Sequence, residues 1–191
     1  VIASVSSSSA VMRGEVWIVP KEFSLTGYER IFSYTRLWNG YLNTIIYTVV
    51  GTVISLICTL PAAYALSKKE FYGRKLFTGM FLFAMFFNGG MIPTYLTMQN
   101  YGLLDTMWAV ILPGAVATYN LILCRSFFVG NIPSDIWESA QLDGCSHAYF
   151  FMKIVLPISK AIISVMVLYY AVTYWNSYFN ALTYLTSQEK Y

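Results

Sequence analysis

The sequence has few charged residues, which make up 11% of its 191 positions, against 57% for hydrophobic residues. Soluble domains average about 25% charged and about 45–50% apolar residues. A soluble fold of this length has no interior large enough for the surplus, so much of it would face water. The composition therefore excludes an ordinary soluble domain and predicts a protein of the lipid bilayer.

Histidine and cysteine are scarce as well. The chain has one histidine, His147, and its cysteines are Cys58, Cys124 and Cys145. The cysteines show no CxxC spacing, and His147 has no second ligand at the spacing of a metal site. We therefore expect no metal and no cofactor, and we interpret His147 as a helix-cap or interface residue.

The motifs of enzymes are missing too. The sequence has no P-loop, no HExxH and no GxSxG. The acidic residues Asp105, Asp135, Glu138 and Asp143 lie in predicted loops or at span ends, whereas a proton relay places ionisable groups inside the spans. We therefore expect no catalytic residues, and a membrane-anchored enzyme or assembly factor finds no support.

Long uncharged stretches predict membrane spans at about 42–66, 76–98, 106–125 and 158–185. A span needs about 20 apolar residues to cross about 30 Å of hydrocarbon. The segment 67–75 carries four basic residues, which marks it as cytoplasmic, and the turn 99–105 carries none. Topology explains this basic run without a nucleic-acid partner. The same topology places the polar loop 132–157 in the cytoplasm.

Small and helix-breaking residues interrupt the predicted spans. A row at four-residue spacing in the first span predicts close packing of another helix: Gly51, Ser55 and Thr59. The second span contains Asn88, Gly89, Gly90 and Pro93, and the third contains Pro113 and Gly114. Irregular backbone at membrane depth must face protein or a water-filled path. Asn88 is thus a candidate pathway residue, although a simple helix end explains the same break.

The last span is rich in aromatic and amide side chains. Tyr170, Tyr174 and Tyr178 recur at four-residue spacing and are predicted to share one helix face, while Asn176 and Asn180 share another. Such faces could bind a sugar by stacking and hydrogen bonding. An interfacial aromatic belt with hydrogen bonds between helices is the simpler explanation of the pattern.

The segment 1–41 has two parts. Its first residues are small and rich in serine, and the rest carries too many charges to span a membrane. We interpret it as the end of a preceding span followed by an extracytoplasmic or interfacial segment. Its aromatic residues suit the membrane interface, and a solvated linker is the alternative. The remainder, 42–191, is expected to form the transmembrane domain.

The loop 132–157 contains a set of residues at defined spacing that begins with Glu138, Ser139 and Ala140. Three residues separate Ala140 from Gly144, and nine residues separate Gly144 from the group Ile154, Leu156 and Pro157. Helix-start residues at 133–135 and a glycine suited to a helix C-terminus predict two short helices joined at a corner. Ser146 is expected to cap the second helix. An amphipathic interfacial hairpin is the alternative interpretation.

This spacing resembles the EAA loop of ABC importer permeases of the MalG-like carbohydrate family, with Ser139 in place of the first alanine. Further stretches resemble the LplC-like branch of that family: FNGGMIPTYL, GLLDTMWAVILPGAV and YWNSYFNAL. The resemblance implies an all-α membrane protein, a polytopic bundle of the type I importer permease (MetI-like) fold in the bacterial cell membrane. It also implies a fragment with about four complete spans, with a further span before Val1 and another after Tyr191.

The resemblance also implies a role. The chain would be a non-catalytic permease subunit for carbohydrate uptake, with an ABC ATPase dimer, a second homologous permease and an extracytoplasmic sugar-binding protein as partners. The residues implied to couple to the ATPase are Glu138, Ser139, Ala140, Asp143, Gly144, Ile154, Leu156 and Pro157. The alternative is a secondary transporter or channel subunit whose hairpin lies on the cytoplasmic interface.

Overall fold

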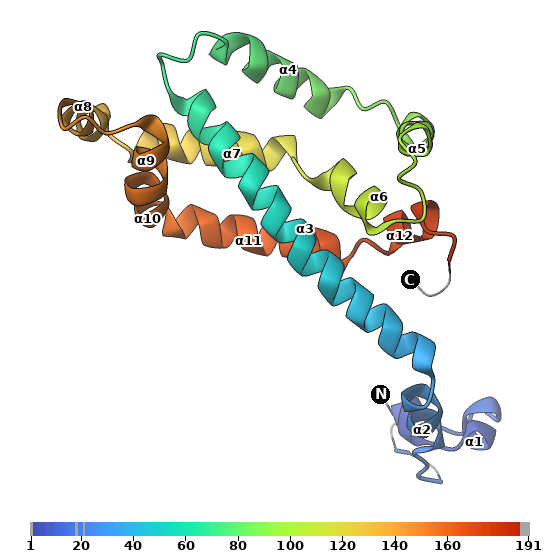
Figure 1. Ribbon diagram of the computed structural model, residues 1–191. Coiled ribbons are helices and arrows are strands. Elements are labelled where there is room, and N and C mark those ends of the chain that lie inside the picture. Colours follow the sequence, from blue (N-terminus) through green and yellow to red (C-terminus); the bar gives the residue numbers. More distant parts are fainter. Residues whose placement is uncertain (1, 18, 21, 188–191) are drawn as a thin grey trace. The chain divides into compact units, whose positions relative to one another are not determined.

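The computed structural model describes residues 2–17, 19–20 and 22–187, and these are mostly helical (Figure 1). The chain divides into two compact units, Val1–Asn43 and Thr44–Tyr191. The spans expected before Val1 and after Tyr191 lie outside the described residues.

The first unit contains short elements: η1 (Ile2–Val5), α1 (Ser8–Met12) and α2 (Thr26–Phe32). Ser7 caps α1 because its Oγ accepts a hydrogen bond from the Ala10 amide at 3.3 Å. Arg13 forms ion pairs with Glu15 at 3.2 Å and Glu22 at 3.7 Å. Large aromatic side chains of this unit are exposed, including Trp17 and Phe23. Both interpretations of this segment, interfacial layer and solvated linker, therefore stay open.

The long helix α3 (Thr35–Ser67) contains the first predicted span. Its 33 residues make it the one helix of the described chain that is long and apolar enough to cross a membrane unbroken. It begins before position 42, so the last residues of the expected N-terminal segment are helical.

The other predicted spans are bent pairs of helices. α4 (Arg74–Phe86) and α5 (Met91–Asn100) meet at 117°. α6 (Met107–Ile111) continues through η2 (Leu112–Gly114) and meets α7 (Thr118–Asn131) at 47°. The segment 147–158 meets α11 (Lys160–Trp175) at 84°. With each pair taken as one span, the described residues hold up to four candidate spans.

Helix ends differ from the expected span ends at two places. α7 continues past position 125 to Asn131. The last stretch is divided, because α11 ends at Trp175 and α12 (Tyr178–Tyr184) follows as a separate helix. Asn176 and Ser177 lie at this division, and such side chains compete with the backbone for hydrogen bonds.

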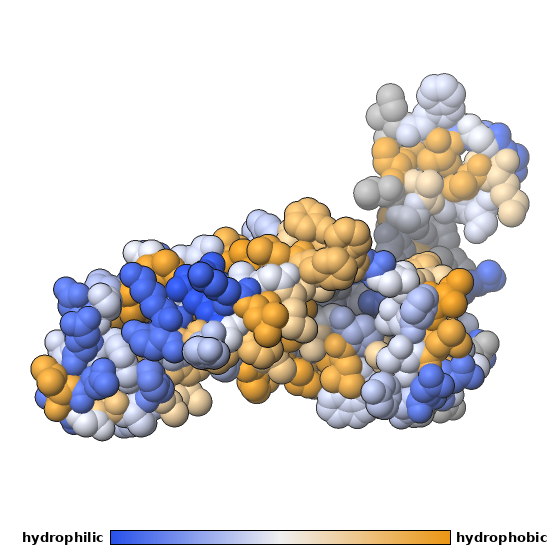
Figure 2. All heavy atoms as spheres, turned by 90° about the horizontal axis from the view of Figure 1, so that it is seen from above, coloured by the Kyte–Doolittle hydropathy of each residue, from blue (hydrophilic) through white to orange (hydrophobic). Residues whose placement is uncertain are grey.

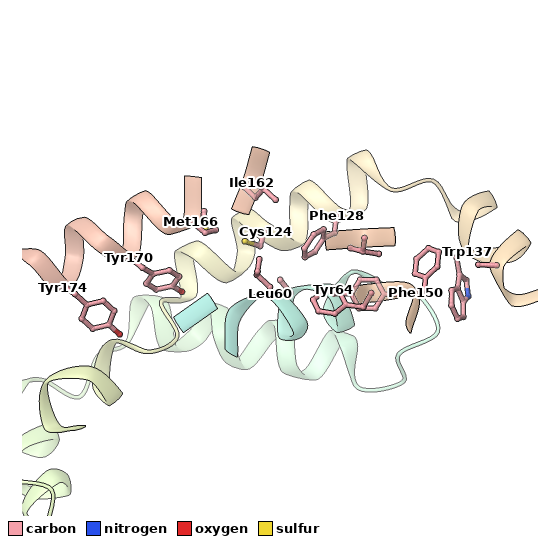
Figure 3. Packing of buried hydrophobic residues seen from close by; sticks show 14 of the residues in the cluster. Leu60, Tyr64, Cys124, Phe128, Trp137, Phe150, Ile162, Met166, Tyr170 and Tyr174 are labelled. Carbon is pink, nitrogen blue, oxygen red and sulfur yellow. The ribbon is translucent and has the colours of Figure 1, made fainter. Parts of the chain in front are cut away.

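The core of the second unit lies between α3, α7 and α11, and one end of it is closed by the polar loop (Figure 3). α3 contributes Leu60 and Tyr64, and α7 contributes Cys124 and Phe128. α11 contributes Ile162, Met166, Tyr170 and Tyr174, and the loop contributes Trp137 and Phe150. The loop is thus packed on the helices rather than hanging free from them.

Two tyrosines of α11 hold α3 against the irregular stretch between α6 and α7. Tyr174 Oη donates its proton to the Ile111 carbonyl at 3.1 Å. It also lies 2.9 Å from Ser55 Oγ, and because its one proton is already used, Ser55 is the donor in that hydrogen bond. Tyr170 Oη lies 2.6 Å from Thr59 Oγ1 and accepts from the Ala117 amide at 3.4 Å. The predicted small-residue row is confirmed as the seam on which α11 packs.

Apolar side chains also cover much of the outside. Ile57 of α3, Phe83 of α4 and Leu168 of α11 are each at least 60% exposed. In Figure 2, hydrophilic residues gather toward the end of the second unit where Figure 1 draws α8 and α9. Apolar outer faces and a polar end are what a helical membrane protein requires.

The close approach at Gly51 predicts a selective stability loss. A Cβ there would lie 2.7 Å from the Tyr174 ring. The contacts of the Tyr174 hydroxyl with Ser55 and with the Ile111 carbonyl hold this ring in place. Gly51→Ala should lower the free energy of unfolding by about 1–3 kcal/mol, as overpacking does, measured by thermal unfolding of the purified full-length protein in detergent. Gly79→Ala is the matched control, because a Cβ at that helical glycine meets nothing within 4 Å. Equal stability of the two variants would contradict the packing argument.

Candidate functional site

The polar loop contains two short helices, α8 (Ser134–Leu142) and α9 (His147–Phe150). Pro133 precedes α8 in an extended conformation, and Asp135 lies in its first turn, where a carboxylate meets the positive end of the helix dipole. The first helix of the loop therefore begins at Ser134, within the helix-start segment 133–135 that the sequence predicts.

The corner after α8 depends on Gly144, whose φ is +75°. The Gly144 amide donates to the Gln141 carbonyl at 3.0 Å, and the Cys145 amide donates to the Ala140 carbonyl at 2.9 Å. This pair of bonds defines a Schellman motif, which needs a left-handed residue at this position. The predicted corner is confirmed.

The second helix is capped as predicted, since Ser146 Oγ accepts from the Tyr149 amide at 3.3 Å. After α9 the chain widens into η3 (Phe151–Val155), a π-helical turn, and continues as α10 (Leu156–Ile158). The break expected at Pro157 falls at Ser159, beyond which α11 turns away. No sequence signal pointed to the π-helical turn.

The predicted coupling residues fall into an outward group and an inward group. The outward group is exposed and consists of Glu138, Ser139, Asp143, Gly144 and Pro157. The inward group consists of Ala140, which is buried, and of Ile154 and Leu156, which are half-buried against the core. Ser139 Oγ donates to the Asp135 carbonyl at 2.9 Å, so the serine at this alanine position bonds within its own helix. The outward group is free to meet a partner, while the inward group fixes the loop.

The exposed surface of the loop mixes charge with apolar side chains. Leu142 is 90% exposed and Tyr149 is 58% exposed. Both lie near the carboxylates Glu138 and Asp143 in the sequence. A surface hollow of about 500 Å³ lies at the corner, lined by Ala140, Asp143, Gly144, Cys145, Ser146, Tyr149 and Ile154. Exposed apolar groups beside charges are typical of a protein-binding surface.

An aromatic cluster under α8 was not predicted. Trp137 stacks on His147 with 4.0 Å between ring centroids, and it meets Phe150 edge-on at 5.0 Å. The interface role expected for His147 is therefore seen. Lys68 Nζ lies 5.1 Å from the ring centroids of Tyr64, Trp137 and Phe150. Burial lowers the pKa of Lys68, and the Glu70 carboxylate opposes this by raising it.

The candidate pathway residues are not brought together. Tyr170 and Tyr174 are buried in the helix contacts described above. Asn88 Oδ1 accepts from the Gly90 amide at 2.9 Å, and Asn176 Nδ2 donates to the Val172 carbonyl at 2.8 Å. Both amides are exposed, as is Asn180 in α12. The predicted tyrosine face is wrong for Tyr178, which is 73% exposed, because α11 ends before it.

Asp105 is a further polar residue whose role the sequence did not indicate. Its carboxylate accepts from the Thr186 amide at 3.0 Å, the Ser187 amide at 2.9 Å and Ser187 Oγ at 2.6 Å. The residue has a positive φ of 59°. Asp105 thereby ties the turn after α5 to the chain after α12.

Comparison with known proteins identifies the class. Residues 37–188 match the family described as binding-protein-dependent transport system inner membrane component. The chain belongs to this family of membrane proteins, which confirms the predicted permease family, its helical fold and its place in the membrane.

Two relatives come from Bacillus subtilis (strain 168). The polygalacturonan/rhamnogalacturonan transport system permease protein YtcP is 41% identical over 100% of this chain and 66% of its own length. Protein LplC is 40% identical over 100% of this chain and 64% of its own length. The chain thus spans about two thirds of these curated relatives. The predicted LplC-like branch is confirmed.

A solved structure has the same fold. It is a bacterial ABC transporter involved in the import of the acidic polysaccharide alginate. One of its chains superposes with a TM-score of 0.93 and 38% sequence identity, covering 99% of this chain and 68% of that chain.

The corner at Gly144 yields a prediction about the loop alone. A Cβ at Gly144 meets nothing within 4 Å, so a substitution there causes no steric clash. Its only cost is the strain of an L residue in the left-handed backbone conformation, about 1–2 kcal/mol. Gly144→Val should raise hydrogen exchange of the α8 amides in the full-length protein, whereas Gly144→Asn, which tolerates this conformation, should raise it less. Gly130→Ala, at an open helical glycine with ordinary φ, is the control. Equal exchange in Gly144→Val and wild type would refute the assigned role of the corner.

Proposed function

We propose that this chain is the permease subunit of an ATP-driven ABC importer for carbohydrates, that is, for sugar or oligosaccharide uptake. The proposal rests on family membership and on the names of the relatives, which are those of polysaccharide transport components. The observation that carries it is the polar loop, which is fixed to the membrane helices on one side and presents Glu138 and Leu142 on the other.

The proposed partners are an ABC ATPase dimer in the cytoplasm, a second homologous permease and an extracytoplasmic sugar-binding protein. The permease pair would enclose the translocation path, with half of it contributed by this chain. ATP hydrolysis belongs to the ATPase, so this chain performs no covalent step.

Coupling would act through the outward group of the loop. Glu138 would contact a basic residue of the ATPase, and Ser139 and Gly144 would allow close approach of its surface. Closure of the ATPase pair would then displace α8. The inward residues Ile154 and Leu156 would pass the displacement through η3 and α10 into α11.

Sugar contacts are proposed for exposed amides rather than for the buried tyrosines. Asn88, Asn176 and Asn180 are exposed and keep hydrogen-bonding capacity for hydroxyl groups. Tyr170 and Tyr174 would shape the wall behind the path, because their hydroxyls are engaged within the protein.

Topology tests the proposal directly. In a cysteine-free full-length background, Ser146→Cys should react with a membrane-impermeant maleimide only after the cells are permeabilised. Tyr101→Cys, at a 75% exposed residue of the predicted external turn, should react in intact cells and serves as the control. Labelling of position 146 in intact cells would place the loop outside, where no ATPase could reach it.

Charge reversal tests the contact itself. In the assembled transporter, Glu138→Lys should reduce ATP-dependent sugar uptake at least tenfold, because truncating a desolvated charge contact typically costs about 2–5 kcal/mol and reversal adds repulsion. Glu29→Lys changes an exposed carboxylate of α2 and should leave uptake unchanged. Full uptake by Glu138→Lys would support the secondary-transporter or channel alternative.

A further inference from the structure

The polar loop is joined covalently to α7 at its start and to α11 at its end, and it makes a further, non-covalent connection to α3. This connection centres on Lys68, which directly follows the end of α3. Its Nζ lies 5.1 Å from three ring centroids: Tyr64 of α3, Trp137 of α8 and Phe150 of α9. The rings lie together at the loop end of the core (Figure 3).

The geometry of the rings suits an ammonium group. Trp137 and Phe150 meet edge-on, so their faces do not stack on each other, and all three rings are at least nine-tenths buried. Cation–π attraction is strongest when the cation is partly desolvated, and Lys68 is only partly exposed. Among the described residues Lys68 forms no ion pair at close range, and the Glu70 carboxylate acts on it only from a longer distance. The three ring faces are therefore the contacts that position its ammonium group.

A second basic residue holds the same end of α3. Arg125 Nε of α7 donates to the Leu66 carbonyl at 3.1 Å, which satisfies a carbonyl in the last turn of α3. The end of α3 is therefore fixed to α7 by Arg125 and connected to the loop by Lys68. A rigid neighbourhood on the α3 side is what a transmitting contact requires.

We propose that Lys68 is a positioning residue that joins α8 and α9 to the end of α3, so that movement of the loop displaces the first complete span as well as α11. The inference rests on the proposed function for its role in transport. The aromatic clamp itself, formed by Lys68, Tyr64, Trp137 and Phe150, is a structural claim that stands apart from it.

The experiment uses the assembled full-length transporter with three single variants. Lys68→Met keeps the length of the side chain without its charge, and Lys68→Arg keeps a cation that binds aromatic faces well. Lys69→Met removes the same charge from the exposed neighbouring lysine, so it reports any effect of the basic loop as a whole.

The first readout is hydrogen exchange of the α8 amides, which needs no transport activity. We expect exchange to rise at least tenfold in Lys68→Met and to stay within twofold of wild type in Lys68→Arg and Lys69→Met. Unchanged exchange in Lys68→Met, or an equal rise in Lys69→Met, would overturn the clamp.

The second readout is the number of ATP molecules hydrolysed per sugar imported in proteoliposomes. We expect this ratio to rise at least tenfold in Lys68→Met, with the ATPase still co-purifying, and to be restored by Lys68→Arg. A wild-type ratio in Lys68→Met, or loss of the ATPase from the complex, would overturn the positioning role. Absence of ATP-driven uptake in wild type would instead reject the proposed function, while the exchange result would still decide the clamp.

Discussion

Inside a bilayer every backbone polar group needs a partner within the protein, because lipid tails offer no hydrogen bonds. The irregular stretch between α6 and α7 releases such groups, and the hydroxyls of Tyr174 and Tyr170 meet the Ile111 carbonyl at its start and the Ala117 amide at its end. The same hydroxyls reach Ser55 and Thr59 of α3, so one set of contacts repairs the break and joins the helices. The core around α3, α7 and α11 depends on this arrangement.

The loop follows from that core, since it packs on the end of it. Trp137 and Phe150 belong to the same buried cluster as Leu60 and Met166. A loop built only from its own hydrogen bonds would be a loose attachment in water. Packing on the helices makes it a body whose displacement must move its neighbours, because packed interiors have little free volume to absorb a shift.

The sequence predicted the helix ends and breaks that depend on a few neighbouring residues. The spacing around Gly144 predicted a corner because a left-handed residue after a helix is a property of the backbone alone. The break residues at 88–90 and 113–114 predicted interruptions because glycine and proline weaken a helix locally. Bend angles were beyond prediction, since packing against neighbouring helices sets them. Tyr178 was misplaced because the polar pair before it, Asn176 and Ser177, was not taken as a helix end.

Lys68 shows why part of the site could not be predicted. In the sequence it is one of four basic residues in a short run, and the positive-inside rule accounts for all four alike. Its neighbour Lys69 has the same charge and the same topological meaning, yet it is exposed. What separates them is that Trp137 and Phe150 fold back onto the end of α3 from distant positions in the chain. A residue that marks topology by its charge can therefore also act by its contacts, and only the fold distinguishes the two.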